Sequence, residues 1–431
     1  MKRVQPLPGA RPYLGLDRVD LSSQMPPVGD QGMQGSCTAW GVAYYHKTHL
    51  EWIEHHWDVT QTRYQFSPAF TYNQINGGVD QGSSVGDAFA LLCEQGCASM
   101  ADCPYNQNNA TSWPSESAYS HALWYRSEAG YFVMLTDTTG LNQVKQLLNN
   151  GYSSVFAIFV WGNFDEISRY GNIYCVSDRT GSNRGGHVVT CVGYDDTLIT
   201  HDGRGAFKLV NSWGTGWGAS GYFWMSYQAV MDELLSQRVA YYMTDLVGYA
   251  PRLIGRVRIQ HTARDRIGIQ ALVGPRSQPV WTKDFRTWRW PKQNRSFPNN
   301  NLVFDFTDGA SYLEDGTTDS ISIAVRDDSA DGRTGYLRLF SGQHLIWDGI
   351  KVATDTPVAI PDQAEPAYLS VCVLHADRDI GIARVIAPAS VVDSGRIVLP
   401  RVQVRNHGTT VASFPVSLRI GTEYADSQYV E

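Results

Sequence analysis

Three short blocks, far apart in the chain, constrain its fold more than any other feature. The first runs from Gln31 through Gly-Met-Gln-Gly-Ser to Cys37, the second is Gly-Gly-His187-Val-Val, and the third is Asn211-Ser-Trp-Gly. His187 follows Cys37 by 150 residues, and Asn211 follows it by 174. A lone cysteine in a Gly/Ser context, with a distant histidine and then an asparagine, is typical of a thiol nucleophile with its base and orienting amide. A chain built on this set must bring the three blocks together.

Residues 36–47 are predicted to form a helix that opens at Cys37. A thiol in the first helical turn is close to unpaired backbone N–H groups and to the positive end of the helix dipole, and both favour the thiolate. An imidazolium from His187 would favour it further. The alternative is a buried structural thiol, the usual state of a lone cysteine. The two other blocks favour the nucleophile.

His187 begins a segment through Tyr194 that alternates as a half-buried strand does. On such a rigid strand it can serve as general base and then as general acid. The amide oxygen of Asn211 can accept a hydrogen bond from its ring and select the productive tautomer, while Trp213 covers that bond. The alternatives are a core histidine, and a turn asparagine beside a core tryptophan.

Gln31 lies six residues before Cys37. Its side-chain amide and the Cys37 backbone N–H would make a two-donor oxyanion hole. Taken alone, a glutamine in a loop is unremarkable. Gly32 and Gly35 around it favour a shaped loop over a solvated one.

These blocks resemble those of the papain (C1) peptidase family over about residues 10–248. The resemblance implies a cysteine peptidase with an α+β, two-lobed catalytic domain, in which a helical lobe faces a β lobe and the site lies between them. It carries the roles of nucleophile, base, orienter and oxyanion donor onto Cys37, His187, Asn211 and Gln31. It also implies peptide-bond hydrolysis through an acyl-enzyme, a protein or peptide substrate, and no metal or organic cofactor.

Where the sequence departs from the plant and lysosomal members, it resembles the bacterial, disulfide-poor branch of the family. Gln34 stands where plant and lysosomal members carry a disulfide cysteine, and Gly82-Ser83-Ser84 occupies the place of their Cys-Asn-Gly-Gly segment. That segment binds substrate backbone in the family, so Gly82 and Ser83 are predicted to bind substrate here. Gly186 and Trp213 complete the predicted substrate-binding set. Gly186 is too small to place a charge in the specificity pocket.

The chain is predicted to hold three units. Residues 1–248 form the papain-like domain, helical to about residue 130 and dominated by strands after it. Residues 251–380 alternate apolar and polar between turns, which predicts an antiparallel, jelly-roll-like β-sandwich. Residues 385–431 resemble the first half of an Ig-like module of bacterial extracellular proteins, so we expect the natural chain to continue beyond Glu431. Contacts between units are expected to be modest and relatively polar.

Composition excludes some partners. The formal net charge is −7 and no basic run favours nucleic acid. No apolar stretch approaches the length of a membrane span. The Ig-like stretch favours a secreted or cell-surface protein, whose β modules attach it to a surface or a large substrate.

Some alternatives stay open. Three of the seven cysteines cluster and could form one disulfide: Cys93, Cys97 and Cys103. The acidic loop from Asp327 to Asp331 could hold Ca²⁺, although a solvated turn is favoured.

The favoured activity is that of an endopeptidase. Its alternatives are an exopeptidase or transpeptidase of the same fold, and an inert surface-binding protein.

Overall fold

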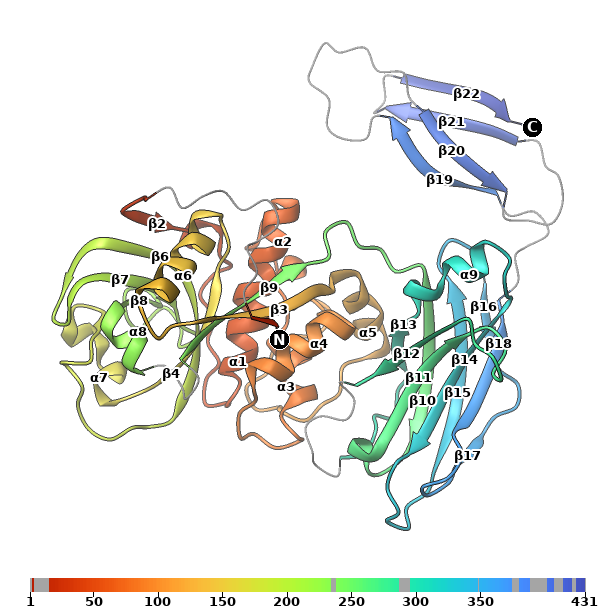
Figure 1. Cartoon of the computed structure of the whole chain (residues 1–431), viewed down its shortest axis with the longest axis horizontal. Helices are drawn as coiled ribbons and strands as arrows, with labels where there is room; N and C mark the ends of the chain where they lie inside the picture. Colours follow the sequence, from red (N-terminus) through yellow and green to blue (C-terminus); the bar gives the residue numbers. More distant parts are fainter. Residues whose placement is uncertain are drawn as a thin grey trace.

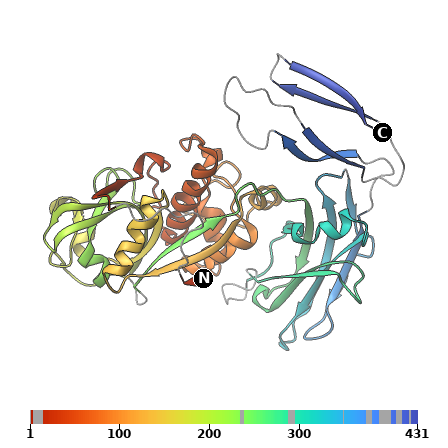
Figure 2. The same cartoon turned by 45° about the horizontal axis from the view of Figure 1, so that its top comes forward.

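The computed structural model describes residues 2–3, 15–233, 238–286, 295–347, 349–373, 380–387, 401–406, 414–420 and 424–430. From left to right, Figure 1 shows a lobe built on a β-sheet, a helical lobe and a pair of β-sheets. The same succession is visible in Figure 2. No helix among the described residues combines the length and apolarity needed to cross a bilayer.

The helical lobe is built around one long helix that starts at Cys37. Its first turn, α1, passes into a π-helical segment (Trp40–Lys47) and then into α2. Two neighbouring helices begin at serine N-caps, because Ser67 accepts from Phe70 N–H and Ser84 accepts from Asp87 N–H. The helices of this lobe are α1 (Cys37–Ala39), α2 (Thr48–His55), α3 (Pro68–Ile75), α4 (Val85–Gln95) and α5 (Glu116–Ala122).

The β lobe is a nine-stranded sheet in the order β1-β3-β9-β4-β6-β7-β8-β5, with β2 paired to β6. Its strands are β1 (Lys2–Arg3), β2 (Arg18–Asp20), β3 (Ser127–Met134), β4 (Ser154–Phe159), β5 (Ile173–Tyr174), β6 (Gly186–Thr200), β7 (Gly203–Val210), β8 (Tyr222–Ser226) and β9 (Val239–Asp245). Three helices accompany it: α6 (Thr138–Asn149), α7 (Gly162–Asp165) and α8 (Tyr227–Glu233). The mixed α+β class is therefore confirmed, although α6 lies in the half expected to be dominated by strands.

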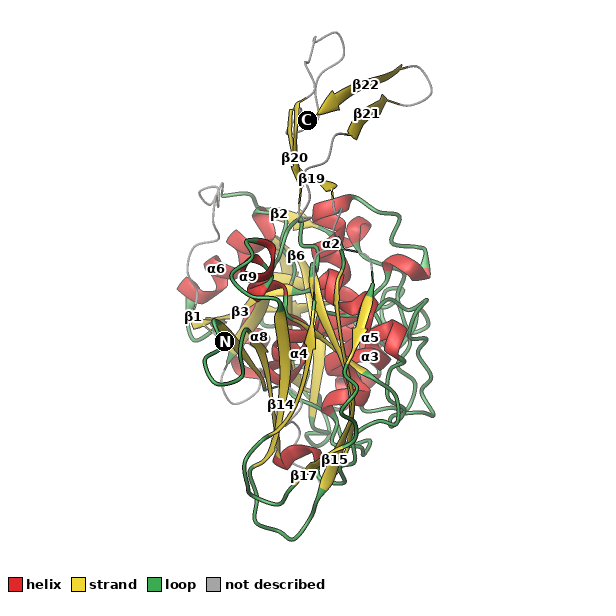
Figure 3. Cartoon of the chain, turned by 90° about the vertical axis from the view of Figure 1, so that its right-hand side faces the viewer, coloured by secondary structure: helices red, strands yellow, loops and turns green. Residues whose placement is uncertain are grey.

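The C-terminal sheets between residues 253 and 372, here called the two-sheet domain, are antiparallel. One has the order β13-β10-β15-β16 with β17 paired to β15, and the other has the order β12-β11-β14-β18. In Figure 3 the two sheets stand side by side, edge-on to the viewer. The elements are β10 (Leu253–Gln260), β11 (Ile267–Val273), β12 (Trp281–Phe285), β13 (Leu302–Asp305), α9 (Ser311–Glu314), β14 (Ser320–Asp327), β15 (Gly335–His344), β16 (Ile350–Val352), β17 (Val358–Ile360) and β18 (Ala367–Cys372). The jelly-roll assignment stays a prediction.

About half of the predicted Ig-like module over 385–431 lies outside the described residues. The described residues from 380 onward form two antiparallel strand pairs, one of β19 (Ile380–Ala387) with β20 (Arg401–Asn406) and one of β21 (Phe414–Ile420) with β22 (Tyr424–Val430).

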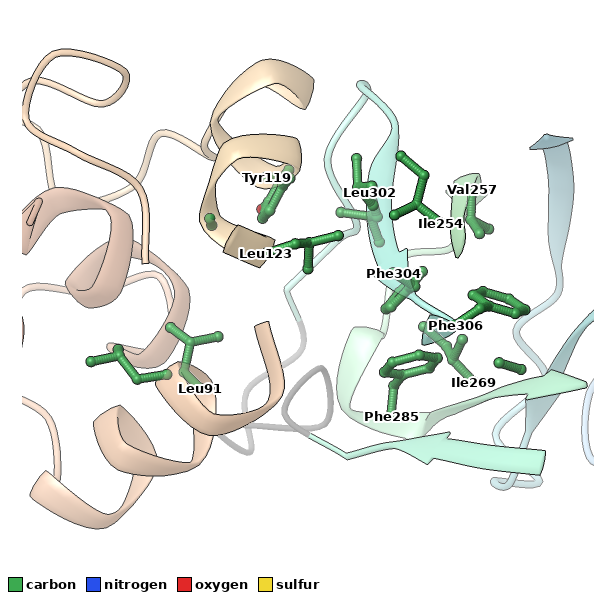
Figure 4. Close-up of a cluster of buried hydrophobic side chains, with 14 of the residues drawn as sticks. Leu91, Tyr119, Leu123, Ile254, Val257, Ile269, Phe285, Leu302, Phe304 and Phe306 are labelled. Atoms are coloured by element: carbon green, nitrogen blue, oxygen red, sulfur yellow. The ribbon is translucent and has the colours of Figure 1, made fainter. Parts of the chain in front are cut away.

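The contact between the helical lobe and the two-sheet domain is not the modest polar one that we expected. One apolar cluster runs through both, and Figure 4 shows Leu123 of the helical lobe beside Leu302 of β13. At its edge, Arg126 Nη1 lies 2.6 Å from the fully buried Asp305 carboxylate. Burial raises the pKa of Asp305, but Arg126 and the neighbouring donors more than offset this and hold it below its usual range. The two parts share a core, so they are expected to unfold together.

One further alternative is resolved within the described residues. All seven cysteines are free thiols, so Cys93, Cys97 and Cys103 form no disulfide. The acidic loop is a different case: the buried Asp327 carboxylate lies 3.1 Å from His261 Nε2, and ligand atoms of Asp327, Asp331 and Asp362 lie within 4.8 Å of one another, so the Ca²⁺ site stays a prediction. The acidic loop is therefore anchored into the two-sheet domain.

Two buried histidines join the long helix to the sheet. The Nδ1 atoms of His46 and His49 each lie 2.9 Å from the Ser153 hydroxyl. Burial lowers the pKa of each to about 3, from the ordinary value of 6.5. Each ring is therefore neutral in the folded state, whereas the unfolded chain binds a proton to it below about pH 6.5.

We predict that this pair makes the fold acid-sensitive. The stability that it contributes is complete above pH 6.5 and is lost as the pH falls toward 3, by about 1.4 kcal/mol per pH unit and histidine. In urea unfolding at pH 7 and pH 5, His49→Gln should lose about 2 kcal/mol less than wild type does between the two pH values. His56→Gln, at an exposed histidine, is the control. An unchanged acid loss in His49→Gln would contradict the prediction.

Candidate active site

Cys37 is the first residue of α1 and is partly buried. Its predicted position at a helix start is thus found in the structure. The N-cap residue Ser36 does not cap the helix with its side chain, because its hydroxyl pairs with Tyr105 Oη at 2.8 Å. Burial raises the pKa of the Cys37 thiol, while the backbone N–H groups of Val188 and Thr38 act in the opposite direction. The Val188 N–H places the thiol at the start of β6.

His187 lies in β6, one residue before Val188, and is buried. Its Nε2 lies 2.7 Å from Asn211 Oδ1. Because Oδ1 can only accept, Nε2 carries the proton in the neutral ring and Nδ1 is the ring nitrogen able to accept one. Burial lowers the pKa of His187 to about 4, and the hydrogen bond to Asn211 partly offsets this. The ring centroid lies 5.0 Å from that of Trp213 and 5.9 Å from that of Phe164.

Asn211 is fully buried, and its position is fixed from several sides. Its Oδ1 accepts a second hydrogen bond, from Ser212 N–H at 2.8 Å. Its backbone carbonyl accepts from Tyr45 Oη at 2.8 Å, and Tyr45 lies on the long helix that begins at Cys37. The amide that orients His187 is therefore tied to the helix that carries the thiol.

Gln31 is 7 % exposed, and both ends of its carboxamide are held. Ser212 Oγ donates to Oε1 at 2.7 Å, and Nε2 donates to Gln34 O at 2.8 Å. The backbone carbonyl of Gln31 accepts from Tyr105 Oη at 2.8 Å. An amide nitrogen has two hydrogens, and the bond to Gln34 O uses one of those on Nε2.

The segment around Gly82 and Ser83 lies against the loop that precedes Cys37. Asp80 Oδ1 accepts from Gly35 N–H at 2.8 Å, and Thr38 Oγ1 donates to Ser83 O at 2.9 Å. Gly82 has a φ of +86°, and a Cβ there would meet nothing closer than Gly35 O at 4.0 Å. The segment thus borders the thiol.

The two remaining predicted residues lie on the other side of the site. Gly186 begins β6 and is exposed, and it pairs with Phe159 of β4. Trp213 is partly exposed, and its ring adjoins that of His187. The structure therefore places all eight predicted residues around one region.

Several residues that hold the site were not identified from the sequence. Ser212 fixes Gln31, and its adjacency to Asn211 is a signal that could have been used. Asp80 and Tyr72 could not have been found in that way, because their link to Gly35 depends on tertiary structure: Tyr72 Oη donates to Asp80 Oδ1 at 2.5 Å.

Comparison with known proteins agrees with this geometry. The family model described as "Papain family cysteine protease" matches residues 16–243. Among curated proteins, the chain is 28 % identical over 220 residues to an uncharacterized peptidase C1-like protein of Acanthamoeba polyphaga mimivirus, covering 48 % of this chain and 66 % of that protein. It is 29 % identical over 204 residues to gamete and mating-type specific protein A of Dictyostelium discoideum, covering 47 % of this chain and 41 % of that protein. The chain thus spans less than two thirds of each.

Solved structures with a similar fold include xylellain, a cysteine protease from Xylella fastidiosa, with a TM-score of 0.46 and 24 % identity, covering 57 % of this chain and 91 % of that one. Another is procathepsin B S9 from Trypanosoma congolense, with a TM-score of 0.46 and 18 % identity, covering 57 % and 83 %. With the family model matching more than half of its residues, the chain belongs to the papain family of cysteine proteases.

Proposed function

We propose that this protein is an endopeptidase that cleaves protein substrates outside the cell by a Cys37-His187-Asn211 thiol mechanism. The observation that carries the proposal is that two side-chain amides, those of Asn211 and Gln31, are immobilised by hydrogen bonds. Asn211 holds the His187 ring at 2.7 Å, and Gln31 is held by Ser212 at 2.7 Å. Such preorganised groups need no rearrangement as charge develops. The extracellular location rests on the predicted Ig-like module and stays a prediction.

The first chemical step transfers the Cys37 proton to Nδ1 of His187 as sulfur attacks the scissile carbonyl carbon. Taken singly, burial favours the neutral thiol and the neutral imidazole. The thiolate and imidazolium formed by the transfer, however, attract each other strongly in a site of low polarity. The two groups therefore titrate as a unit. Asn211 accepts from Nε2 and stabilises the imidazolium.

The second step stabilises and then breaks the tetrahedral intermediate. Its oxyanion accepts hydrogen bonds from the second Nε2 hydrogen of Gln31 and from the Cys37 backbone N–H. The C–N bond breaks, and His187 gives its proton to the leaving amine. His187 then takes a proton from water as its oxygen attacks the thioester carbon. The C–S bond breaks, the acid leaves, and His187 returns its proton to the Cys37 sulfur.

Two alternative functions are open to experiment. An exopeptidase or transpeptidase would prefer substrates with a free amino terminus, or would transfer the acyl group to an added amine rather than to water. Cleavage of internally quenched peptides blocked at both ends favours the endopeptidase. An inert surface-binding protein would not be labelled by an epoxide inhibitor of thiol peptidases.

We predict that Cys37→Ala abolishes peptide cleavage without unfolding the protein, because the variant removes the proposed nucleophile. Epoxide labelling, followed by mass spectrometry, should be lost as well. Cys372→Ala, which removes an exposed free thiol, is the matched control and should retain both properties. Cleavage by Cys37→Ala within about tenfold of wild type would refute the mechanism.

We predict that Gln31→Ala lowers kcat by about 10²–10³ and changes KM little, because its donor matters most as the oxyanion forms. Ser212→Ala should cause a smaller loss of the same kind, since it leaves the Gln31 amide in place but unanchored at Oε1. Gln61→Ala, at an exposed glutamine, serves as the control. A change confined to KM in Gln31→Ala would show that its amide lies outside the oxyanion hole.

A further inference from the structure

Two arginines of the two-sheet domain reach into the helical lobe. The guanidinium carbon of Arg295 lies 3.8 Å from the ring centroid of Trp113, and that of Arg264 lies 4.8 Å from it. Arg264 is 1 % exposed, and its backbone N–H donates to Arg295 O at 2.9 Å. The two side chains are therefore built into the boundary between the parts rather than lying on its surface.

Both arginines donate to the end of α3. Arg295 Nη1 lies 2.6 Å from Asn73 O, and Arg264 Nη1 lies 3.3 Å from Gln74 O. These carbonyls belong to the last turn of α3, where intrahelical partners run out and the helix dipole is negative. Arg295 also donates through Nη2 to Thr111 O, in the loop of residues 105–112. One guanidinium thus joins two separate segments of the helical lobe.

The first segment leads from α3 to the substrate side of the thiol. Asn76 Nδ2 donates to Ala110 O at 2.7 Å, and Gly78 N–H donates to Asn76 Oδ1 at 2.8 Å. At Gly78 a Cβ would lie 3.0 Å from Arg295 Cδ, so the arginine packs directly against this turn. Two residues later Asp80 binds Gly35 N–H, and Gly82 N–H donates to Tyr72 Oη at 3.2 Å.

The second segment leads from Thr111 back to the loop of the predicted oxyanion donor. Asn73 Nδ2 donates to Ser112 O at 3.0 Å, which ties the 105–112 loop to α3. At the other end of this loop, Gln107 Oε1 accepts from Met33 N–H at 3.1 Å. The Gln31 loop, however, has anchors of its own in Ser212 and Tyr105. It should therefore depend less on Arg295 than the turn at Gly78 does.

We propose that Arg295 is a positioning residue for substrate binding, through which the two-sheet domain holds the 76–83 segment in its binding geometry. The proposal rests on the proposed peptidase function, because it assigns the 76–83 segment to the substrate backbone. Arg295 touches no reacting atom, so its loss should weaken substrate binding and leave the chemical step nearly intact.

The test uses the full-length chain and an internally quenched peptide that extends several residues before the scissile bond. Arg295→Ala should raise KM about tenfold and change kcat less than about threefold. Arg295→Lys keeps a cation that can reach one carbonyl but loses the forked geometry. Its KM should therefore lie between that of wild type and that of Arg295→Ala. The rate of Cys37 alkylation by iodoacetamide, which needs no peptide subsite, should equal that of wild type in both variants.

Arg256→Ala is the matched control. Arg256 belongs to β10 and forms an ion pair with Glu116 across the same boundary, at 3.1 Å. Arg256→Ala should leave KM unchanged, although it removes one positive charge from this boundary just as Arg295→Ala does. A KM that rises equally in Arg256→Ala, or a folded Arg295→Ala with wild-type KM, would overturn the proposal.

Two further results are distinguishable from these. If Arg295→Ala does not fold, Arg295→Lys decides alone: a raised KM supports the proposal and a wild-type KM overturns it. If the wild-type chain cleaves no peptide although iodoacetamide modifies Cys37, the proposed function fails, and the role of Arg295 in it fails for that reason, not because of the variants.

Discussion

The close contact between the long helix and strand β6 is the constraint on which the rest of the site depends. At Gly41, one turn after Cys37, a Cβ would lie 2.8 Å from Val188 Cγ1, so a larger residue would push the helix away from the strand. Thr190 Oγ1 donates to Gly41 O at 2.9 Å and fixes the register along the strand. Because Val188 follows His187 directly, this contact sets the position of the thiol relative to the imidazole.

The same close packing disfavours the charged forms of Cys37 and His187, and fixed dipoles nearby offset part of this effect. Burial raises the pKa of Cys37 and lowers that of His187, and both shifts oppose the ion pair that the proposed reaction needs. The backbone N–H of Val188 and the amide of Asn211 counteract these shifts. Neither dipole has to reorient during the reaction, and a dry site increases the effect of each. Close packing around the site and an ionisable thiol can therefore coexist.

Sequence patterns predicted the parts of the fold that local chemistry determines. The helix predicted over residues 36–47 does begin at Cys37, and the strand predicted from His187 to Tyr194 lies within β6. Helix α6 was missed between strands, although Asp137 caps it and its apolar residues recur at helical spacing. Strand β12 departs from the alternation expected over residues 251–380, because Thr282, Lys283 and Asp284 follow one another between its two aromatic ends. For the site, the blocks indicated which residues meet, but the anchors Asp80 and Tyr105 depend on loops that only tertiary structure brings together.

The boundary between the helical lobe and the two-sheet domain could not be predicted for a related reason. Its apolar residues, such as Leu123 and Leu302, have the pattern of ordinary core residues, and nothing local indicates that they share one core. Helix α3 shows why the two parts are joined. It has eight residues, and its last carbonyls need hydrogen-bond donors from outside the helix. Those donors come from Arg264 and Arg295, which lie almost two hundred residues or more further along the chain. Because the last carbonyls of α3 accept hydrogen bonds from arginines of the two-sheet domain, the geometry of the loop that follows α3 depends on that domain.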